Sequence, residues 1–132
     1  MIVADTNVWA RSFLHDDAAQ ARKARKALAE ARAAGGVFVP LIVMAELAWV
    51  LRGSKEWTRD RVLSTLESLL QTRGVVVESP ALVRDAIEAA RKNGKGGFAD
   101  HLIAQVGFSN GCREVITFEN KFGKAAGVRR LA

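Results

Sequence analysis

The sequence predicts an α/β fold built around a mostly parallel sheet. Short apolar runs typical of buried strands recur along the 132 residues, and amphipathic or Ala-rich segments of helical length separate them. Strands that alternate with helices pair in parallel, because each helix returns the chain to the same end of the sheet. No repeat, linker or low-complexity tract interrupts this pattern. We therefore expect a single domain over residues 1–132, with four to five short strands flanked by helices.

The first third of the chain contains a strand followed by two helices. Residues 2–4 form an apolar strand, and residues 5–7 (Asp-Thr-Asn) supply N-cap side chains for a helix over about residues 8–14. A pair of Asp residues opens a long Ala-rich helix over residues 16–33, which Gly-Gly at 35–36 ends.

The middle of the chain begins with a strand over residues 37–39 that Pro40 stops. Residues 41–51 form a helix that is apolar nearly all round, which predicts burial or an interface. After a Gly-Ser break, Thr58 caps an amphipathic helix that extends to about residue 72.

The last part continues the alternation. Residues 75–77 form a strand, and Pro80 lies in the first turn of a helix over about residues 80–93. The Gly-Lys-Gly-Gly segment 94–97 is expected to be the most flexible one. The remaining elements are a helix over residues 98–110, a strand over 114–117, a short helical turn over 122–126 and an edge strand over 128–131.

Composition and charge restrict the class of protein. About half of the residues are apolar and about a quarter are charged, an ordinary globular balance. The net charge of +6 favours polyanionic partners. Cys112 has no second cysteine to pair with, so a reducing compartment is expected. The start of the chain lacks the features of a signal peptide, and the longest apolar run is too short to cross a bilayer. We expect a cytoplasmic protein with no membrane partner.

Four acidic residues stand in apolar or small-residue surroundings: Asp5, Glu46, Asp100 and Glu119. A carboxylate that loses its water without a partner costs several kcal/mol, so it finds a cation or becomes neutral. Asp5 and Glu119 follow strands, and sites in parallel α/β sheets collect at the carboxyl ends of strands. If the four carboxylates lie together, a bound divalent metal ion is the usual way to neutralise their charge. This suggests metal-dependent chemistry on phosphate.

Each carboxylate also has an ordinary structural interpretation. Asp5 would be a helix cap, Asp100 a first-turn residue that favours the helix dipole, and Glu119 a solvated loop acid. Glu46 has no obvious exposed face in its apolar run, so its alternative is a salt bridge inside the protein. The candidate partners for that salt bridge are Arg52 and Arg11.

Four segments taken together resemble a known family. Residues 2–7 (IVADTN) are similar to the opening of PIN domains, specifically of the VapC-type toxin ribonucleases. The resemblance continues with Glu46 in a helix after the second strand, with residues 98–104 (FADHLIA) and with residues 115–122 (VITFENKF). It covers nearly the whole chain, with the segments in the same order.

The resemblance implies a Rossmann-like sheet and a metal-dependent ribonuclease that hydrolyses RNA phosphodiester bonds with Mg²⁺ or Mn²⁺. It also implies a homodimer and neutralisation by a cognate antitoxin protein. The family pattern maps its acids onto Asp5, Glu46 and Asp100. Supporting polar residues would be Thr6, Asn7, Thr117 and Asn120. Sequence does not distinguish one metal from two.

The fourth acidic position departs from the family pattern. The family usually has Asp after Thr-Phe, where this chain has Glu119, and the next acid of the pattern is replaced by Lys121. Glu119 is longer by one methylene and can still reach a metal directly or through water. Asn120 is the alternative, as a neutral oxygen ligand.

Basic and aromatic residues leave several interpretations open. Candidate contacts to RNA or to a partner are Lys95, Arg91, Arg11, Arg22 and Arg25, although a solvated helix face also explains the last two. His15 and His101 suggest a general base, but adjacent helical residues such as Asp100 and His101 point about 100° apart. The apolar helical surface at residues 41–51 or 58–72 is expected to form the dimer interface.

Three other functions compete with this interpretation, and the residues disfavour the first two. A haloacid-dehalogenase phosphatase needs a second Asp two residues after the first, where Asn7 stands. A receiver domain needs an Asp after a central strand, but Glu78 follows residues 75–77. A catalytically inactive PIN-fold binding module is the third, and the change at Glu119 and Lys121 is its supporting feature.

Overall fold

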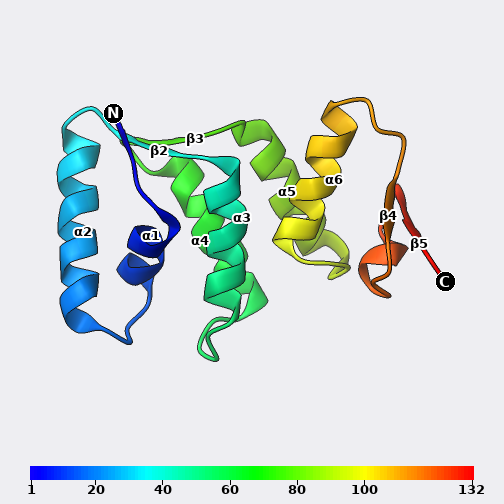
Figure 1. Cartoon of the computed structure of the whole chain (residues 1–132), viewed down its shortest axis with the longest axis horizontal. Helices are drawn as coiled ribbons and strands as arrows, with labels where there is room; N and C mark the ends of the chain where they lie inside the picture. Colours follow the sequence, from blue (N-terminus) through cyan, green and yellow to red (C-terminus); the bar gives the residue numbers. More distant parts are fainter. The chain divides into compact units, whose positions relative to one another are not determined.

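Short strands and helices alternate along the computed structural model, which describes the backbone of residues 1–132 and every side chain except that of Asn93 (Figure 1). The elements are β1 (Ile2–Val3), α1 (Thr6–Phe13), α2 (Ala18–Ala33), β2 (Val37–Val39), α3 (Leu41–Arg52), α4 (Arg59–Gln71), β3 (Val75–Val77), α5 (Pro80–Asn93), α6 (Phe98–Ser109), β4 (Val115–Thr117), the 3₁₀ turn η1 (Phe122–Lys124) and β5 (Val128–Arg130). The chain divides into two compact units, residues 1–79 and 80–132. The predicted α/β class is confirmed.

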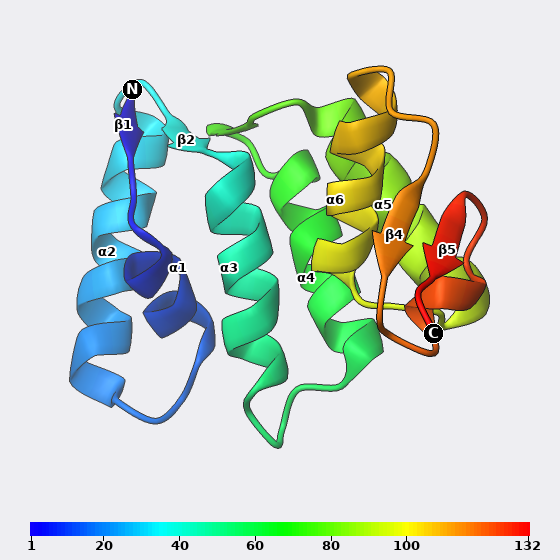
Figure 2. The same ribbon diagram turned by 45° about the vertical axis from the view of Figure 1, so that its right-hand side comes forward.

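The first unit is organised around a three-stranded parallel sheet. Its strand order is β1-β2-β3, with Ile2 opposite Val37 and Val39 opposite Val77. The central strand β2 has neighbours on both sides, and its Val37 and Val39 are fully buried. Both views show α1 lying between α2 and α3, and α1 packs on both (Figures 1 and 2).

Helices α3 and α4 supply most of the core of the first unit. Leu47, Leu51, Leu63 and Leu66 are almost completely buried. Thr58 caps α4 by accepting a hydrogen bond from the Arg61 amide at 3.2 Å, which confirms the predicted start of that helix. Capping of this kind contributes about 1 kcal/mol to helix stability.

Helix α3 is not buried all round, although its sequence is apolar nearly all round. Ile42, Trp49 and Val50 are exposed by 69%, 78% and 37%, and Glu46 is exposed on the same helix. Residues 42, 46, 49 and 50 recur at helical spacing, so they form one stripe along α3. We call this set the α3 stripe.

The second unit pairs two helices and two strands. Helices α5 and α6 pack on each other, and β4 pairs with β5 in parallel, with Val115 opposite Val128 (Figure 2). Arg129 also holds Glu114 through an ion pair of 2.9 Å between Nη2 and Oε1. Hydrogen bonding from Arg129 lowers the pKa of the Glu114 carboxyl. The five strands thus form a three-stranded and a two-stranded parallel sheet, one in each unit.

The observed boundaries differ from the predicted ones by one to two residues at most ends. One of the two-residue shifts is at α1, which begins at Thr6 directly after Asp5 and therefore includes two of the residues expected to cap it. Along the described chain, no helix combines the length and the hydropathy that a membrane span requires.

Candidate functional site

Asp5 stands where β1 passes into α1. It occupies the N-cap position of α1 with extended backbone angles, yet its side chain makes no capping hydrogen bond. The Asp5 carbonyl accepts the Val8 amide at 3.0 Å, so the helix start is satisfied by the backbone. The carboxylate is exposed, and within the described residues it has no hydrogen-bond or ion-pair partner. Asp5 therefore occupies the N-cap position without capping the helix through its side chain, and its carboxylate is available.

Thr6 connects Asp5 to Glu46. The Thr6 hydroxyl, on a residue only 8% exposed, donates to Glu46 Oε1 at 3.1 Å. This bond joins the first residue of α1 to the middle of α3, which are 40 positions apart in sequence. It brings the Asp5 and Glu46 segments to one corner of the first unit.

The salt-bridge alternative for Glu46 is wrong, as is the expectation that it lacks an exposed face. Arg11 pairs instead with Asp16 at 2.8 Å. Arg52 donates to the Trp57 carbonyl at 3.1 Å. Glu46 lies on the exposed α3 stripe, and the hydroxyl of Thr6 is its side-chain partner among the described residues. Its second carboxylate oxygen accepts no hydrogen bond from the described residues.

The metal-dependent ribonuclease expected from the sequence predicts that replacement of Thr6 by Val lowers its activity by about tenfold, the order seen when a group that orients a metal ligand is lost. Val keeps the shape of Thr but removes the hydroxyl that holds Glu46 Oε1. Thr6→Ser keeps the donor and should retain most of the activity. Steady-state cleavage rates of the two variants at saturating metal measure the difference. Equal rates for Thr6→Val and wild type would remove Thr6 from the site.

Asp100 lies in the second unit, in the first turn of α6. Its Oδ2 accepts the Gly97 amide at 3.0 Å, so it closes the start of its own helix. The ordinary interpretation of Asp100 as a first-turn residue is therefore confirmed. The other carboxylate oxygen accepts no hydrogen bond from the described residues, and the side chain is half-buried. One helix-start role and one ligand role are compatible in the same carboxylate.

His101 has a structural role. Its ring is 6% exposed, hydrogen-bonds through Nε2 to the Lys95 carbonyl, and packs edge-on against Phe122 with centroids 5.4 Å apart. These contacts tie α6 to the Gly-rich segment and to η1. The histidine is therefore committed to packing, as its direction away from Asp100 indicated.

Glu119 lies in the exposed turn after β4. Its amide donates to Thr117 Oγ1 at 3.1 Å, and its carbonyl accepts the Gly123 amide at 3.1 Å. These bonds fix the backbone of the turn and leave the carboxylate exposed, with no partner among the residues that the structure describes. Thr117 therefore shapes the turn, while Asn120 is exposed beside Glu119.

The donor chemistry fits a hard divalent cation. Each unit contributes two carboxylates from the predicted set, and in neither unit does an Arg or Lys side chain pair with any of them, as far as the described residues show. Carboxylate oxygens are the ligands that Mg²⁺ and Mn²⁺ prefer. Within the described part of either unit, no three His, Cys, Asp or Glu side chains lie close enough to hold a metal by themselves.

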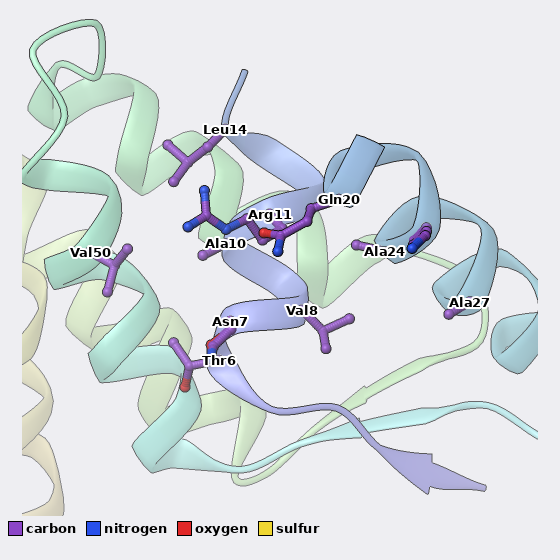
Figure 3. Close-up of a pocket in the computed structure, with 11 residues that line it drawn as sticks. Thr6, Asn7, Val8, Ala10, Arg11, Leu14, Gln20, Ala24, Ala27 and Val50 are labelled. Atoms are coloured by element: carbon purple, nitrogen blue, oxygen red, sulfur yellow. The ribbon is translucent and has the colours of Figure 1, made fainter. Parts of the chain in front are cut away.

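A pocket of about 570 Å³ opens beside Thr6 and Asn7 in the first unit. Figure 3 shows Thr6 and Asn7 at the start of α1, with Arg11 on the same helix and Gln20 on α2 further along the pocket. Helix α2 contributes a polar pair, Gln20 and Lys23, together with small alanines. Gln20 is absent from the predicted contacts, although residues 20, 23, 24 and 27 share one helical face.

The predicted basic contacts have different surroundings. Arg25 donates to the Ser12 carbonyl at 2.9 Å, and Arg11 is held by Asp16, whose pKa is lowered by the hydrogen bond from Arg11. Arg22 and Arg91 are exposed on α2 and α5. Lys95 is half-buried and donates to the Lys124 carbonyl at 3.5 Å. Of the basic run on α2, it is Lys23 that lines the pocket.

Comparison with known proteins gives two findings. The PIN domain family model matches residues 2–128 of the chain. A VapC ribonuclease of Aquifex aeolicus (strain VF5) is 31% identical over 88 residues. That match covers 67% of this chain and 64% of the relative, so the chain spans slightly less than two thirds of the relative's length.

Proposed function

The chain belongs to the PIN domain family, and from that premise we propose that it is a metal-dependent ribonuclease, the toxin of a toxin–antitoxin pair. The proposal rests on one observation: the Thr6 hydroxyl donates a hydrogen bond to Glu46, which ties Glu46 to the segment that contains Asp5. Two carboxylates with no cationic partner there favour metal-dependent phosphodiester chemistry. The VapC ribonuclease similar to this chain supports the same activity.

We propose that the two units act as one PIN domain over residues 1–132. The family match extends across both units, from residue 2 to residue 128. Asp5 and Glu46 come from the first unit and Asp100 and Glu119 from the second. The four carboxylates would together hold Mg²⁺ or Mn²⁺, in a one-metal or a two-metal site.

When bound, the metal would polarise the phosphate and lower the pKa of the attacking water. The residues of the chain have separate tasks around it. Asp5, Glu46 and Asp100 would bind the metal, and Thr6 holds Glu46 in place by donating its hydroxyl hydrogen to Oε1. Gly97 orients Asp100 through its amide. Glu119 or Asn120 fills the fourth position from a turn that Thr117 fixes. Asn7 can donate to the phosphate from the edge of the pocket.

The activity is tested by incubating structured RNAs with the purified protein and Mg²⁺ or Mn²⁺. Cleavage should require the metal and stop when a chelator is added. Asp85→Asn is a matched control, because it removes an exposed acid of α5 that is outside the site. Cleavage that persists in chelator contradicts the mechanism. Absence of both metal binding and cleavage would instead indicate an inactive PIN-fold binding module.

A cognate antitoxin is the proposed protein partner. An Arg of that partner can pair with Asp5 or Glu46 in bidentate fashion and exclude the metal. Exposed cations such as Arg22 on α2 would attract acidic segments of the same partner. The lone, exposed Cys112 agrees with a cytoplasmic location, where thiols stay reduced.

We expect a homodimer that uses the α3 stripe. Exposed Ile42, Trp49 and Val50 place three large apolar side chains on this stripe, on both sides of Glu46, and large apolar side chains gathered on one exposed helix face are typical of an interface. The exposed side of α4 carries polar residues such as Arg61 and Ser68, which favours α3 over α4.

Trp49→Ser should convert the dimer to a monomer, because a large aromatic residue at the centre of an interface carries much of its energy. Val76→Ser is the control, since Val76 is also an exposed apolar residue but lies on β3. Light scattering at tens of micromolar protein distinguishes the two. A wild-type protein that is monomeric under these conditions contradicts the expectation.

A further inference from the structure

A second pocket lies entirely within the unit of residues 80–132. It has a volume of about 290 Å³ and is bounded by α5, α6 and the segment that leads into β5. Its polar lining consists of Lys92, Lys95, His101 and Gln105, and its aromatic side is Phe108. Small apolar residues, mostly alanines, complete the lining. None of the proposed functions above uses this pocket.

The walls of the pocket are held in place by packing. The Phe108 ring lies against Gly127 so closely that a Cβ on Gly127 would be 2.8 Å from Phe108 Cζ. His101 is buried and hydrogen-bonds to the Lys95 carbonyl, so the start of α6 and the Gly-rich segment move together. A ligand would therefore enter a pocket that is largely preformed, which lowers the entropic cost of binding.

The chemistry of the lining fits a nucleotide. Lys92 and Lys95 can contact a phosphate, Phe108 can stack on a base, and the Gln105 amide can donate to and accept from a base edge. No carboxylate lines the pocket among the described residues, and Lys92 and Lys95 supply positive charge there. The volume is at the lower end of the range for small-molecule sites, which suits one nucleotide.

The pocket begins close to a residue of the proposed metal site. Ala104 and Phe108 line it and follow Asp100 on α6 by one and two helical turns of about 5.4 Å each. Successive nucleotides of an extended RNA strand are separated by a similar distance. We propose that this pocket binds one nucleotide of the RNA substrate, next to the phosphodiester that is cleaved. The inference rests on the proposed ribonuclease function for the identity of the ligand.

The test titrates AMP, GMP, CMP and UMP separately into the full chain and follows the amide and side-chain NMR signals. At least one of the four should shift the signals of Gln105 and Phe108 and leave those of residues 1–79 unchanged. Gln105→Met keeps the size of the side chain but removes its amide, and should weaken that binding by about tenfold, as expected for losing a base contact. Gln71→Met, at the exposed end of α4, is the matched control and should bind like wild type.

RNA cleavage provides the second measurement. Gln105→Met and Lys92→Gln should raise KM with kcat nearly unchanged, because neither residue touches the proposed carboxylates. The Lys92→Gln effect should shrink at high salt, since it removes one phosphate contact. A folded backbone is checked by the dispersion of the same NMR spectra.

The outcomes separate this inference from the proposed function. Nucleotide binding at Gln105 without any RNA cleavage would contradict the proposed ribonuclease function but support the assignment of the pocket as a nucleotide site. The opposite outcome is RNA cleavage with an unchanged KM in both variants and no nucleotide-induced shift at Gln105. It would contradict nucleotide binding in the pocket and support the ribonuclease function. Shifts at Gln105 caused by an acidic peptide but by none of the nucleotides would assign the pocket to a protein partner and overturn the inference.

Discussion

Asp5→Asn should reduce metal-dependent RNA cleavage by more than about 100-fold, because losing even a group that only orients a metal ligand costs about 10–100-fold. The fold should survive. Asn is as good an N-cap as Asp, and the Asp5 side chain makes no capping bond that the change would remove. Loss of the charge at the start of α1 costs at most about 1 kcal/mol through the helix dipole, and relief of repulsion among neighbouring carboxylates offsets part of it.

The comparison with Glu119→Gln makes this test specific. Glu119 lies in an exposed turn, and Asn120 or water can take its place, so its loss should be milder than that of Asp5. Cleavage by both variants is measured with the thermal unfolding of each, and Asp85→Asn serves again as the control. Full activity in Asp5→Asn would contradict the assigned role, and an unfolded variant would contradict the expectation that the fold survives.

The largest effect on stability is expected from Gly74→Ala. Gly74 ends the turn before β3 with φ +82, and a Cβ there would lie 2.6 Å from the Arg32 carbonyl oxygen. Left-handed backbone costs a non-Gly residue about 1–2 kcal/mol, and forcing atoms into occupied space costs about 1–3 kcal/mol more. Together these lower the free energy of unfolding by about 2–5 kcal/mol, which corresponds to a fall in Tm of about 10 °C or more for a domain of this size.

Gly111→Ala separates the two causes. Gly111 has nearly the same backbone angle, φ +85, but no atom lies within 4 Å of the position that its Cβ would take. Its replacement should cost only the backbone part, about 1–2 kcal/mol. Urea unfolding of the two variants and wild type measures the difference. Equal destabilisation by the two changes would show that the close approach of Gly74 to α2 has no energetic consequence.

Features of the fold that depend on local chemistry could be predicted from the sequence. The central strand Val37–Val39 is bounded by glycines and Pro40, and it has the predicted bounds. Asp17 accepts the Gln20 amide at 3.0 Å and Thr58 accepts the Arg61 amide, so both predicted helix starts are confirmed. Caps and breakers act within a few residues, which is why a single sequence reveals them.

Features that depend on distant partners could not be predicted. Helix α3 is apolar on nearly every face, so its periodicity did not indicate that Glu46 and Trp49 are on the exposed side. The hydrogen bond from Thr6 to Glu46 joins residues 40 positions apart, and no local pattern selects Thr6 over Arg52 as the partner. Composition likewise indicates where a three-residue strand lies, but a strand this short does not determine which other strand it pairs with. The convergence of all four acids stays a prediction.

The central claim is that one metal site draws carboxylates from both units, and Mn²⁺ titration followed by NMR tests it most directly. Mn²⁺ broadens the signals of nuclei close to it. At one equivalent, broadening should affect Thr6 and Glu46 together with Gly97 and Asp100, and Asp5→Asn should remove it from both units. Broadening confined to residues 1–79 or to residues 80–132, or broadening that Asp5→Asn leaves unchanged, would contradict a shared site.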